Sequence, residues 1–307
     1  MHPADDFNPV VGEPTTLETG LRRIVADNPS PMTYRGTNTY IVGTRGLAVI
    51  DPGPESPTHL AAILAAVGPN QHVSHIIVSH THLDHSPLAR PLADRTGAPV
   101  LAFGEATSGR SAIMRALAES GPIGGGEGID TNFRPDKTLV DGAMIDGDGW
   151  QLEALHTPGH IGNHLCFAWQ DACLTADHVM GWASSLVSPP DGDVSDFIAS
   201  CARLRARSWR VFYPGHGAII TDPAARLDWL VSHRKAREQS ILDSLNAGPA
   251  DAATLAAQIY TDTHPKLLQA AARNVLAHLV DLTDKSLVFP DGKLSPSARF
   301  RLNEASH

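Results

Sequence analysis

The feature that most constrains this chain is the polar run SHTHLDHS at residues 79–86, which directly follows an apolar, strand-like segment. In extended backbone, alternate side chains share a face, so His80 and His82 are expected to point the same way and reach one metal ion. Asp84 and His85 are expected to open a helix, which turns their side chains toward a second ion. A polar turn with ordinary structural histidines is the alternative, but a ligand cluster this dense rarely arises from composition alone.

Three more ligand-type residues each follow an apolar, strand-like segment by a few positions. His160 ends the sequence TPGH, Asp177 stands in LTADH, and His216 stands in YPGHG. Separate strands that deliver side chains to one edge of a sheet hold a geometry that loops cannot hold. We therefore expect these residues to join the first cluster. Imidazole and carboxylate ligands suit Zn²⁺, and also Fe²⁺ or Mn²⁺.

These motifs resemble those of the metallo-β-lactamase superfamily, whose signature H-x-H-x-D-H is present at residues 80–85. The later motifs follow in the family's order, and residues 38–42 and 49–53 resemble its opening strands. The resemblance implies an α/β fold, an αββα sandwich with two metal ions. It implies that the first ion is held by His80, His82 and His160, the second by Asp84, His85 and His216, and both by Asp177.

The same resemblance implies a hydrolase. Two divalent ions about 3.5–4 Å apart share a water molecule and lower its pKa toward about 7, so a metal-bridging hydroxide is available at neutral pH. That hydroxide attacks a carbonyl carbon or a phosphorus. Asp84 is expected to be catalytic as well as a ligand, because it can accept or pass on a proton. Zn²⁺ is the expected metal, with Fe or Mn as alternatives.

Four residues are weaker candidates for contacts with the ligands or the substrate. Asp51 is either a turn residue or the carboxylate that orients a ligand histidine. His164, four residues after one predicted ligand, either faces the substrate or is a hydrogen-bonded structural histidine. His178 directly follows another predicted ligand and either supports the site or is simply buried. Tyr34 lies on a turn-rich loop at residues 28–36, and together with Thr37 and Asn38 it is predicted to rim the cleft.

The composition changes after residue 222. Residues 223–245, 252–260 and 264–282 have helical patterns, and residues 286–289 and 299–302 read as a hairpin. We therefore predict a catalytic domain at 1–225 and a winged-helix-like domain at 226–307. This arrangement resembles the subgroup of the superfamily that includes the endoribonuclease β-lactamase-like protein 2.

One segment of the catalytic domain, residues 104–138, interrupts the alternation of strands and helices. It contains a glycine-rich run at 121–128. No Gly-Lys-Ser/Thr sequence completes a phosphate-binding loop there, so we predict a flap or insertion that shapes the substrate cleft.

Composition excludes several classes of protein. The net charge of −9 argues against a nucleic-acid binder that works through bulk charge. The arginines at 203, 205, 207 and 210 are either a solvated helix face or a phosphate contact. Cys166, Cys173 and Cys201 lack metal-ligand spacing and are expected to be buried thiols. The first residues show no secretory signal, and no apolar run reaches the roughly 20 residues that span a membrane, so a cytoplasmic protein is expected.

Three functions remain open at this point. The first is a hydrolase of a small-molecule ester, thioester or lactone, with β-lactam hydrolysis less favoured. The second is a metal-dependent endoribonuclease or phosphodiesterase acting on RNA. The third is a winged-helix regulator whose metal site only senses, although its third helix carries just Lys266 and Arg273 as basic residues. Packing or homodimer formation is the more plausible role of the C-terminal domain.

Overall fold

The computed structural model describes residues 7–121, 123–124, 128–261 and 263–303. Residues 1–6, which were examined for a secretory signal, therefore lie outside the described residues. So does part of the glycine-rich run at 121–128. No helix in the described ranges has the length and apolar character needed to cross a membrane.

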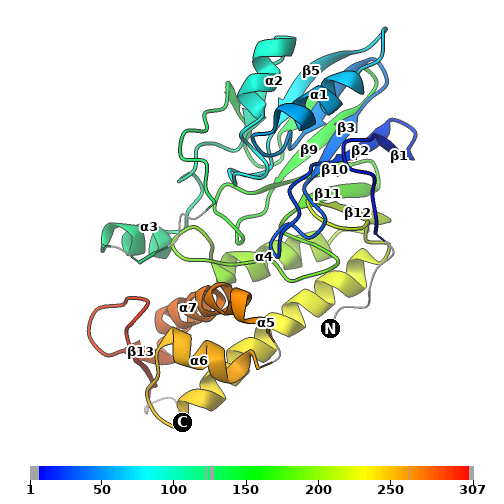
Figure 1. The fold of residues 1–307 in the computed structure, drawn as a ribbon. Helices are drawn as coiled ribbons and strands as arrows, with labels where there is room; N and C mark the ends of the chain where they lie inside the picture. Colours follow the sequence, from blue (N-terminus) through cyan, green and yellow to red (C-terminus); the bar gives the residue numbers. More distant parts are fainter. Residues whose placement is uncertain (1–6, 122, 125–127, 262, 304–307) are drawn as a thin grey trace.

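Two β-sheets form the centre of the molecule (Figure 1). The first has seven strands in chain order: β1 (Thr15–Glu18), β2 (Leu21–Val25), β3 (Asn38–Val42), β4 (Gly46–Ile50), β5 (His72–Ile77), β6 (Val100–Ala102) and β7 (Lys137–Thr138). The second has five, in the order β12 (Val211–Pro214), β11 (Ala172–Ala176), β10 (Leu165–Trp169), β9 (Gln151–His156) and β8 (Met144–Asp146).

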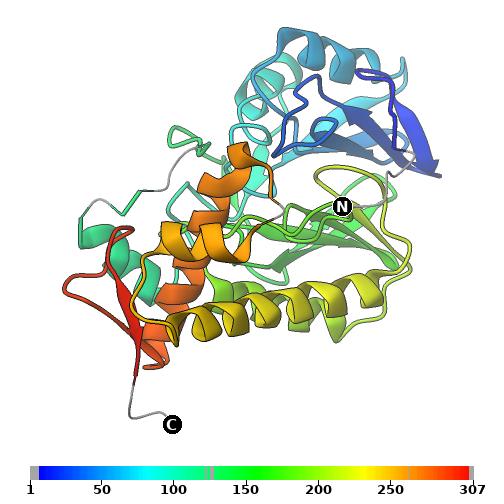
Figure 2. The ribbon, with the colours of Figure 1, turned by 60° about the horizontal axis from the view of Figure 1, so that its bottom comes forward.

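Side chains on each strand point alternately to the two faces of its sheet, so each sheet packs against the other sheet on one face and against helices on the other. In β4, Ala48 and Ile50 face the second sheet and share one core with its side chains. Leu47 and Val49 face the other way and pack beneath α1 (Pro57–Ala65) and α2 (Ala89–Thr96). The second sheet is covered on its outer face by α4 (Val194–Arg205) and α5 (Pro223–Leu245). The predicted αββα sandwich is thus confirmed, and Figure 2 shows its layers in order.

The C-terminal part also matches its predicted class. It contains α6 (Ala252–Ile259), the short 3₁₀ helix η1 (Pro265–Leu267), α7 (Leu268–Asp284) and an antiparallel pair, β13 (Val288–Pro290) with β14 (Phe300–Leu302). The long helix α5 belongs to both parts: Leu227 packs below the second sheet, whereas Leu245 packs in the C-terminal core. The boundary at 225/226 stays a prediction.

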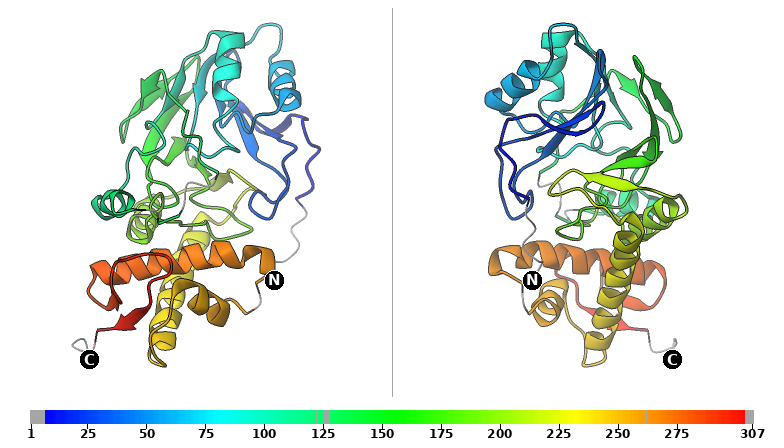
Figure 3. Two further views of the ribbon diagram at one scale, coloured as in Figure 1. Left: turned by 60° about the vertical axis from the view of Figure 1, so that its left-hand side comes forward. Right: turned by 90° about the vertical axis from the view of Figure 1, so that its right-hand side faces the viewer.

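The segment at 104–138 leaves the sandwich and reaches the C-terminal domain. Its helix α3 (Ala112–Glu119) begins at the capping residue Ser111 and places Met114 and Leu117 in the C-terminal core. Figure 3 shows α3 beside the orange and red C-terminal elements. This insertion therefore connects the two parts of the chain.

Two local predictions were wrong. Strand β5 ends at Ile77, so His80 and His82 are not in extended strand. Asp84 and His85 lie in a series of turns, and α2 begins only at Ala89.

The cause of the last error is a long-range contact. Gly53, in the loop after β4, donates its N–H to the carbonyl of His85 and accepts from the N–H of Leu88. These bonds tie residues 85–88 to a distant loop and remove backbone groups that a helix would need.

Candidate metal centre

Seven side chains converge where several strands end. His80, Asp177 and His216 follow β5, β11 and β12 by only a few residues, and His160 follows β9. The ligand atoms form two groups, within each of which they lie within 4.8 Å of one another. The first group is His80, His82, His160 and Asp177; the second is Asp84, His85, Asp177 and His216.

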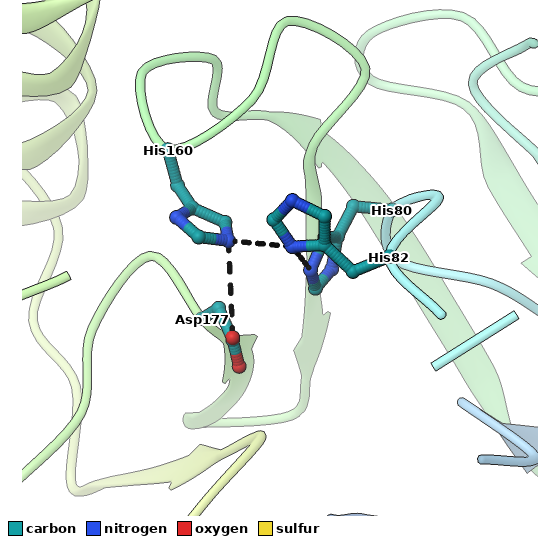
Figure 4. Close-up of side chains that lie close together, drawn as sticks. All are labelled: His80, His82, His160 and Asp177. Atoms are coloured by element: carbon teal, nitrogen blue, oxygen red, sulfur yellow. Dashed lines mark hydrogen bonds and ion pairs between the residues drawn. The ribbon is translucent and has the colours of Figure 1, made fainter. Parts of the chain in front are cut away.

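The first group is compact. His82 Nδ1 lies 2.9 Å from His80 Nε2 and 3.0 Å from His160 Nε2. The carboxylate of Asp177 is 3.8 Å from the same nitrogen of His160. Figure 4 shows these four side chains pointing toward a common point from separate segments of the chain.

The second group places histidines against two carboxylates. Asp84 Oδ2 lies 3.0 Å from His216 Nε2 and 3.3 Å from His85 Nε2. Asp177 Oδ1 and Oδ2 lie 3.4 Å from His85 and His216, respectively. Asp177 is therefore the side chain shared by both groups.

Backbone carbonyls set the tautomers of two ligand histidines. The carbonyl of Leu186 lies 2.6 Å from His160 Nδ1, and that of Gly36 lies 3.1 Å from His216 Nδ1. A carbonyl can only accept, so each Nδ1 carries the proton. The Nε2 atoms that face the centre are then left to accept a proton or bind a metal ion.

Asp51 orients two further histidines. It accepts from His85 Nδ1 at 3.0 Å and from the hydroxyl of Ser79 at 2.7 Å. Since that hydroxyl proton goes to Asp51, the Ser79 oxygen accepts from His80 Nδ1 at 2.9 Å. One buried carboxylate thus contacts one histidine of the second group directly and one of the first group through Ser79, an arrangement that fits the orienting role proposed for Asp51.

The first group fits a cation. His80 and His160 both present Nε2 to His82 Nδ1, which can carry at most one proton. Three nitrogen lone pairs and a carboxylate around one point are the donor set of a divalent transition metal such as Zn²⁺. In the second group, buried atoms His85 Nε2 and Asp177 Oδ1 make no hydrogen bond to any described residue, which also suits a bound ion.

The two groups differ in their affinity for protons. Burial lowers the pKa of His80 well below its usual range, that of His82 to about 3 and that of His160 below its usual value, so the histidines of the first group are neutral. Burial also disfavours charge on His216, but Asp177 and Asp84 outweigh it and raise its pKa to about 10. Asp84 and Asp177 likewise raise the pKa of His85 above its usual range against the effect of burial. Protons on His85 and His216 thus hold the second group together when no metal is bound.

Comparison with known proteins identifies the family. The sequence pattern of the metallo-β-lactamase superfamily matches residues 32–236, and that of the β-lactamase-associated winged helix domain matches residues 252–294. The chain belongs to the metallo-β-lactamase superfamily. Both parts of the predicted resemblance are thereby confirmed.

Several members of the superfamily are similar over most of this chain. Lactamase-like protein nscB of Neosartorya fischeri is 30% identical over 77% of this chain and 65% of its own length. The atrochrysone carboxyl ACP thioesterase of Aspergillus fumigatus is 25% identical over 89% of this chain and 80% of its own. The β-lactamase-like protein 2 homolog of Caenorhabditis elegans is 26% identical over 89% and 87%.

The chain spans slightly less than two thirds of the length of lactamase-like protein nscB. Among solved structures, a β-lactamase domain protein from Burkholderia ambifaria has the same fold, with a TM-score of 0.80 and 18% identity over 98% of this chain and 97% of its own.

In this member of the superfamily, two weaker candidates lie outside the centre. His164 is fully buried, with Nδ1 at 2.9 Å from the Thr157 hydroxyl and its ring 5.2 Å from that of His80, so it packs behind the ligands. His178 lies deeper, 3.5 Å from Cys201 Sγ, and burial lowers its pKa to about 3. All three cysteines are free and buried, as predicted.

Tyr34 contributes indirectly. Its ring stacks on that of Trp182 with centroids 5.0 Å apart, and Trp182 lines the cleft beside the centre. Tyr34 therefore supports the wall of the cleft from behind.

Thr37 and Asn38, which were predicted to rim the cleft, make hydrogen bonds that hold the centre together. The Thr37 hydroxyl lies 3.3 Å from Asp84 Oδ2. The Asn38 side chain donates to the carbonyls of Pro214 and Gly217 at 2.9 and 3.0 Å, so it fixes the loop that carries His216. These contacts could not be predicted from the sequence, because polar residues at the start of a strand are common and do not indicate a particular partner.

Gly215 has a steric role beside His216. A Cβ atom there would lie 2.3 Å from Asp177 Oδ1, closer than any side chain can approach. Glycine therefore lets the backbone of this loop pass directly against the shared carboxylate.

The centre opens into a cleft between the two parts of the chain. One lobe has a volume of about 400 Å³ and contacts both ligand groups. We name it the apolar lobe; its walls include Met32, Met180, Trp182, Leu186, Tyr260 and Leu267. The C-terminal domain thus forms part of the wall around the metal centre.

The arginine stretch has a structural explanation. Arg203 pairs with Asp141, Arg205 with Asp228, and Arg207 with Glu153, at 2.7, 3.0 and 2.8 Å. Arg210 pairs with Glu18 and Asp171. Because Arg210 precedes β12 and His216 follows it, Arg210 lies at the opposite end of that strand from the candidate metal centre. All four arginines are thus paired with carboxylates of this chain, which favours a solvated face over a contact with RNA phosphate.

Proposed function

We propose that this chain is a dinuclear metal-dependent hydrolase of small esters or thioesters. The proposal rests on one observation: residues of both ligand groups line the apolar lobe. A lobe of about 400 Å³ with apolar walls suits an acyl group of moderate size. The related A. fumigatus protein, whose name describes a thioesterase, supports the thioester reading.

Two bound divalent ions would supply Lewis acidity that makes water a nucleophile at neutral pH. The first ion would be held by His80, His82 and His160, the second by Asp84, His85 and His216, with Asp177 shared. Zn²⁺ is the metal we expect, and Fe²⁺ or Mn²⁺ also suit these donors.

The protein's own groups position the reaction. The Met32 and Trp182 side chains form an apolar wall on one side of the cleft. Asp84 is the partly exposed carboxylate of the set and faces the cleft, so we assign it the transfer of a proton between water and the leaving group. Thr37 keeps its carboxylate in place by a hydrogen bond.

A panel of substrates tests the proposal. Purified protein loaded with Zn²⁺, Fe²⁺ or Mn²⁺ is assayed with a thioester, an ester, a lactone, a β-lactam and single-stranded RNA. We expect turnover of the ester or thioester, and we expect His82→Ala to lose one metal equivalent and nearly all turnover. His75→Ala, a change to a partly exposed histidine outside the centre, is the control. Full activity in His82→Ala, or cleavage of RNA alone, would contradict the proposal.

A further inference from the structure

A second lobe of the cleft extends from the first ligand group. It has a volume of about 410 Å³ and contacts His82 and His160. Its rim is shared with the apolar lobe through Met32, Leu186 and Leu267. The two lobes are therefore parts of one cleft, and a substrate held at the metal centre can place one end in each.

The second lobe differs from the first in its polar lining. Beyond the shared rim it is lined by Ser30, Ser188, Asp191, Lys266, Gln269 and Arg273. Asp191 is already paired with Arg110, so its negative charge is compensated. Lys266 makes no ion pair with a carboxylate of the described residues. We name this part the charged lobe, and its net character is cationic.

Both cationic side chains come from the C-terminal domain, Lys266 from η1 and Arg273 from α7. Arg273 is held rigidly, since it donates to the Ser188 hydroxyl at 2.8 Å and to the carbonyls of Ile123 and Pro189. Lys266 is exposed at the lobe, where a lysine can move to meet an anion. Lys266 and Arg273, the two basic residues noted above in the predicted helix at 264–282, therefore both line the cleft.

From these observations we infer that the charged lobe binds an anionic group on the leaving-group side of the substrate, with Lys266 as a specificity-determining residue. This inference rests on the proposed function. The substrate class is then an apolar acyl thioester whose thiol carries a phosphate or a carboxylate. Hydrolysis adds water across its C–S bond: the hydroxyl goes to the acyl carbon and the proton to the sulfur.

Matched thioesters test the assignment. The same hexanoyl group is joined to pantetheine, to 4′-phosphopantetheine and to glutathione, so that the thiol is neutral, carries a phosphate or carries carboxylates. For the zinc-loaded protein, Lys266→Ala is expected to lower kcat/KM for an anionic thioester by about tenfold, the size of one charge-assisted contact, and to leave the neutral thioester unchanged. Lys266→Arg should restore the preference.

Lys235→Ala is the control, because it removes the same charge from an exposed position on α5. An equal effect of Lys266→Ala on neutral and anionic thioesters, or no effect on either anionic one, overturns the assignment. The two anionic thioesters show which anion the lobe takes.

A binding measurement separates this inference from the proposed function. S-methyl-4′-phosphopantetheine and S-methylglutathione have no scissile bond, so their affinities do not depend on turnover. If no ester or thioester is hydrolysed, the proposed function fails. In that case, the charged lobe is still supported as an anion site if either ligand binds Lys266→Ala more weakly than it binds the unaltered chain. If both ligands bind the variant and the unaltered chain equally well, the anion site is overturned.

Discussion

Asn274 of the C-terminal helix α7 accepts a hydrogen bond from the backbone N–H of Val187 at 3.0 Å. The residue before Val187 is Leu186, whose carbonyl holds His160. The same Asn274 oxygen accepts from the buried Arg234 of α5, also at 3.0 Å. The C-terminal domain thus helps to set the position of His160, a predicted metal ligand that belongs to the sandwich.

We expect Asn274→Ala to weaken metal binding at the first group by up to about tenfold, because the loop that fixes His160 loses its anchor. The buried Arg234 also loses an acceptor, which should lower the free energy of unfolding by about 1–3 kcal/mol. Metal titration and chemical denaturation measure the two effects. Asn246→Ala, at the end of α5, is the control and should change neither.

Asp51→Asn should lower the affinity for both metal ions by about 10–100-fold, because an amide has one accepting oxygen where the carboxylate has two. It cannot accept from the Ser79 N–H as well as from the Ser79 hydroxyl and His85. Asn tolerates the left-handed backbone of position 51, where φ is 51°, so the substitution adds little strain. Metal titration against a chelator of known affinity measures the loss. Asp228→Asn, an exposed change, should leave affinity intact, and an equal loss there would contradict the assigned role.

Metal binding at neutral pH should release about two protons, one each from His85 and His216, whose pKa values are raised when no metal is bound. Below the raised pKa of His216, about 10, the proton competes with the ion. Affinity of the second group should therefore fall as pH is lowered, by roughly tenfold per unit for each proton displaced. Calorimetry in buffers of different ionisation enthalpy counts these protons. Release of none would show that the second group binds no metal.

Trp182→Ala should raise KM for a hexanoyl thioester by about tenfold, as expected from the loss of roughly 1.4 kcal/mol of apolar contact. An acetyl thioester, too short to reach far into the apolar lobe, should change much less. Steady-state kinetics with both substrates measures the difference. Trp229→Ala, which removes an exposed tryptophan from α5, serves as the control. Equal effects on the two acyl lengths would mean that Trp182 does not line the acyl site.

Sequence patterns indicated strand-like segments and the residues able to bind metal, because alternation along strands and clustered ligand-type side chains are short-range features. The αββα order was implied by the resemblance of these motifs to the superfamily. Strand–ligand spacing was enough to predict that His160, Asp177 and His216 would meet the cluster at 80–85. Their role as ligands remains a prediction that the geometry supports.

Only the tertiary structure decided how residues 79–88 run, since Gly53 draws them into turns through bonds across more than 30 positions of sequence. It also decided that α3 packs on the C-terminal domain and that Lys266 and Arg273 face the cleft. These arrangements depend on contacts between distant segments, whose free energies no local pattern encodes. For this protein, sequence patterns therefore located the chemistry, whereas long-range packing shaped the cleft around it.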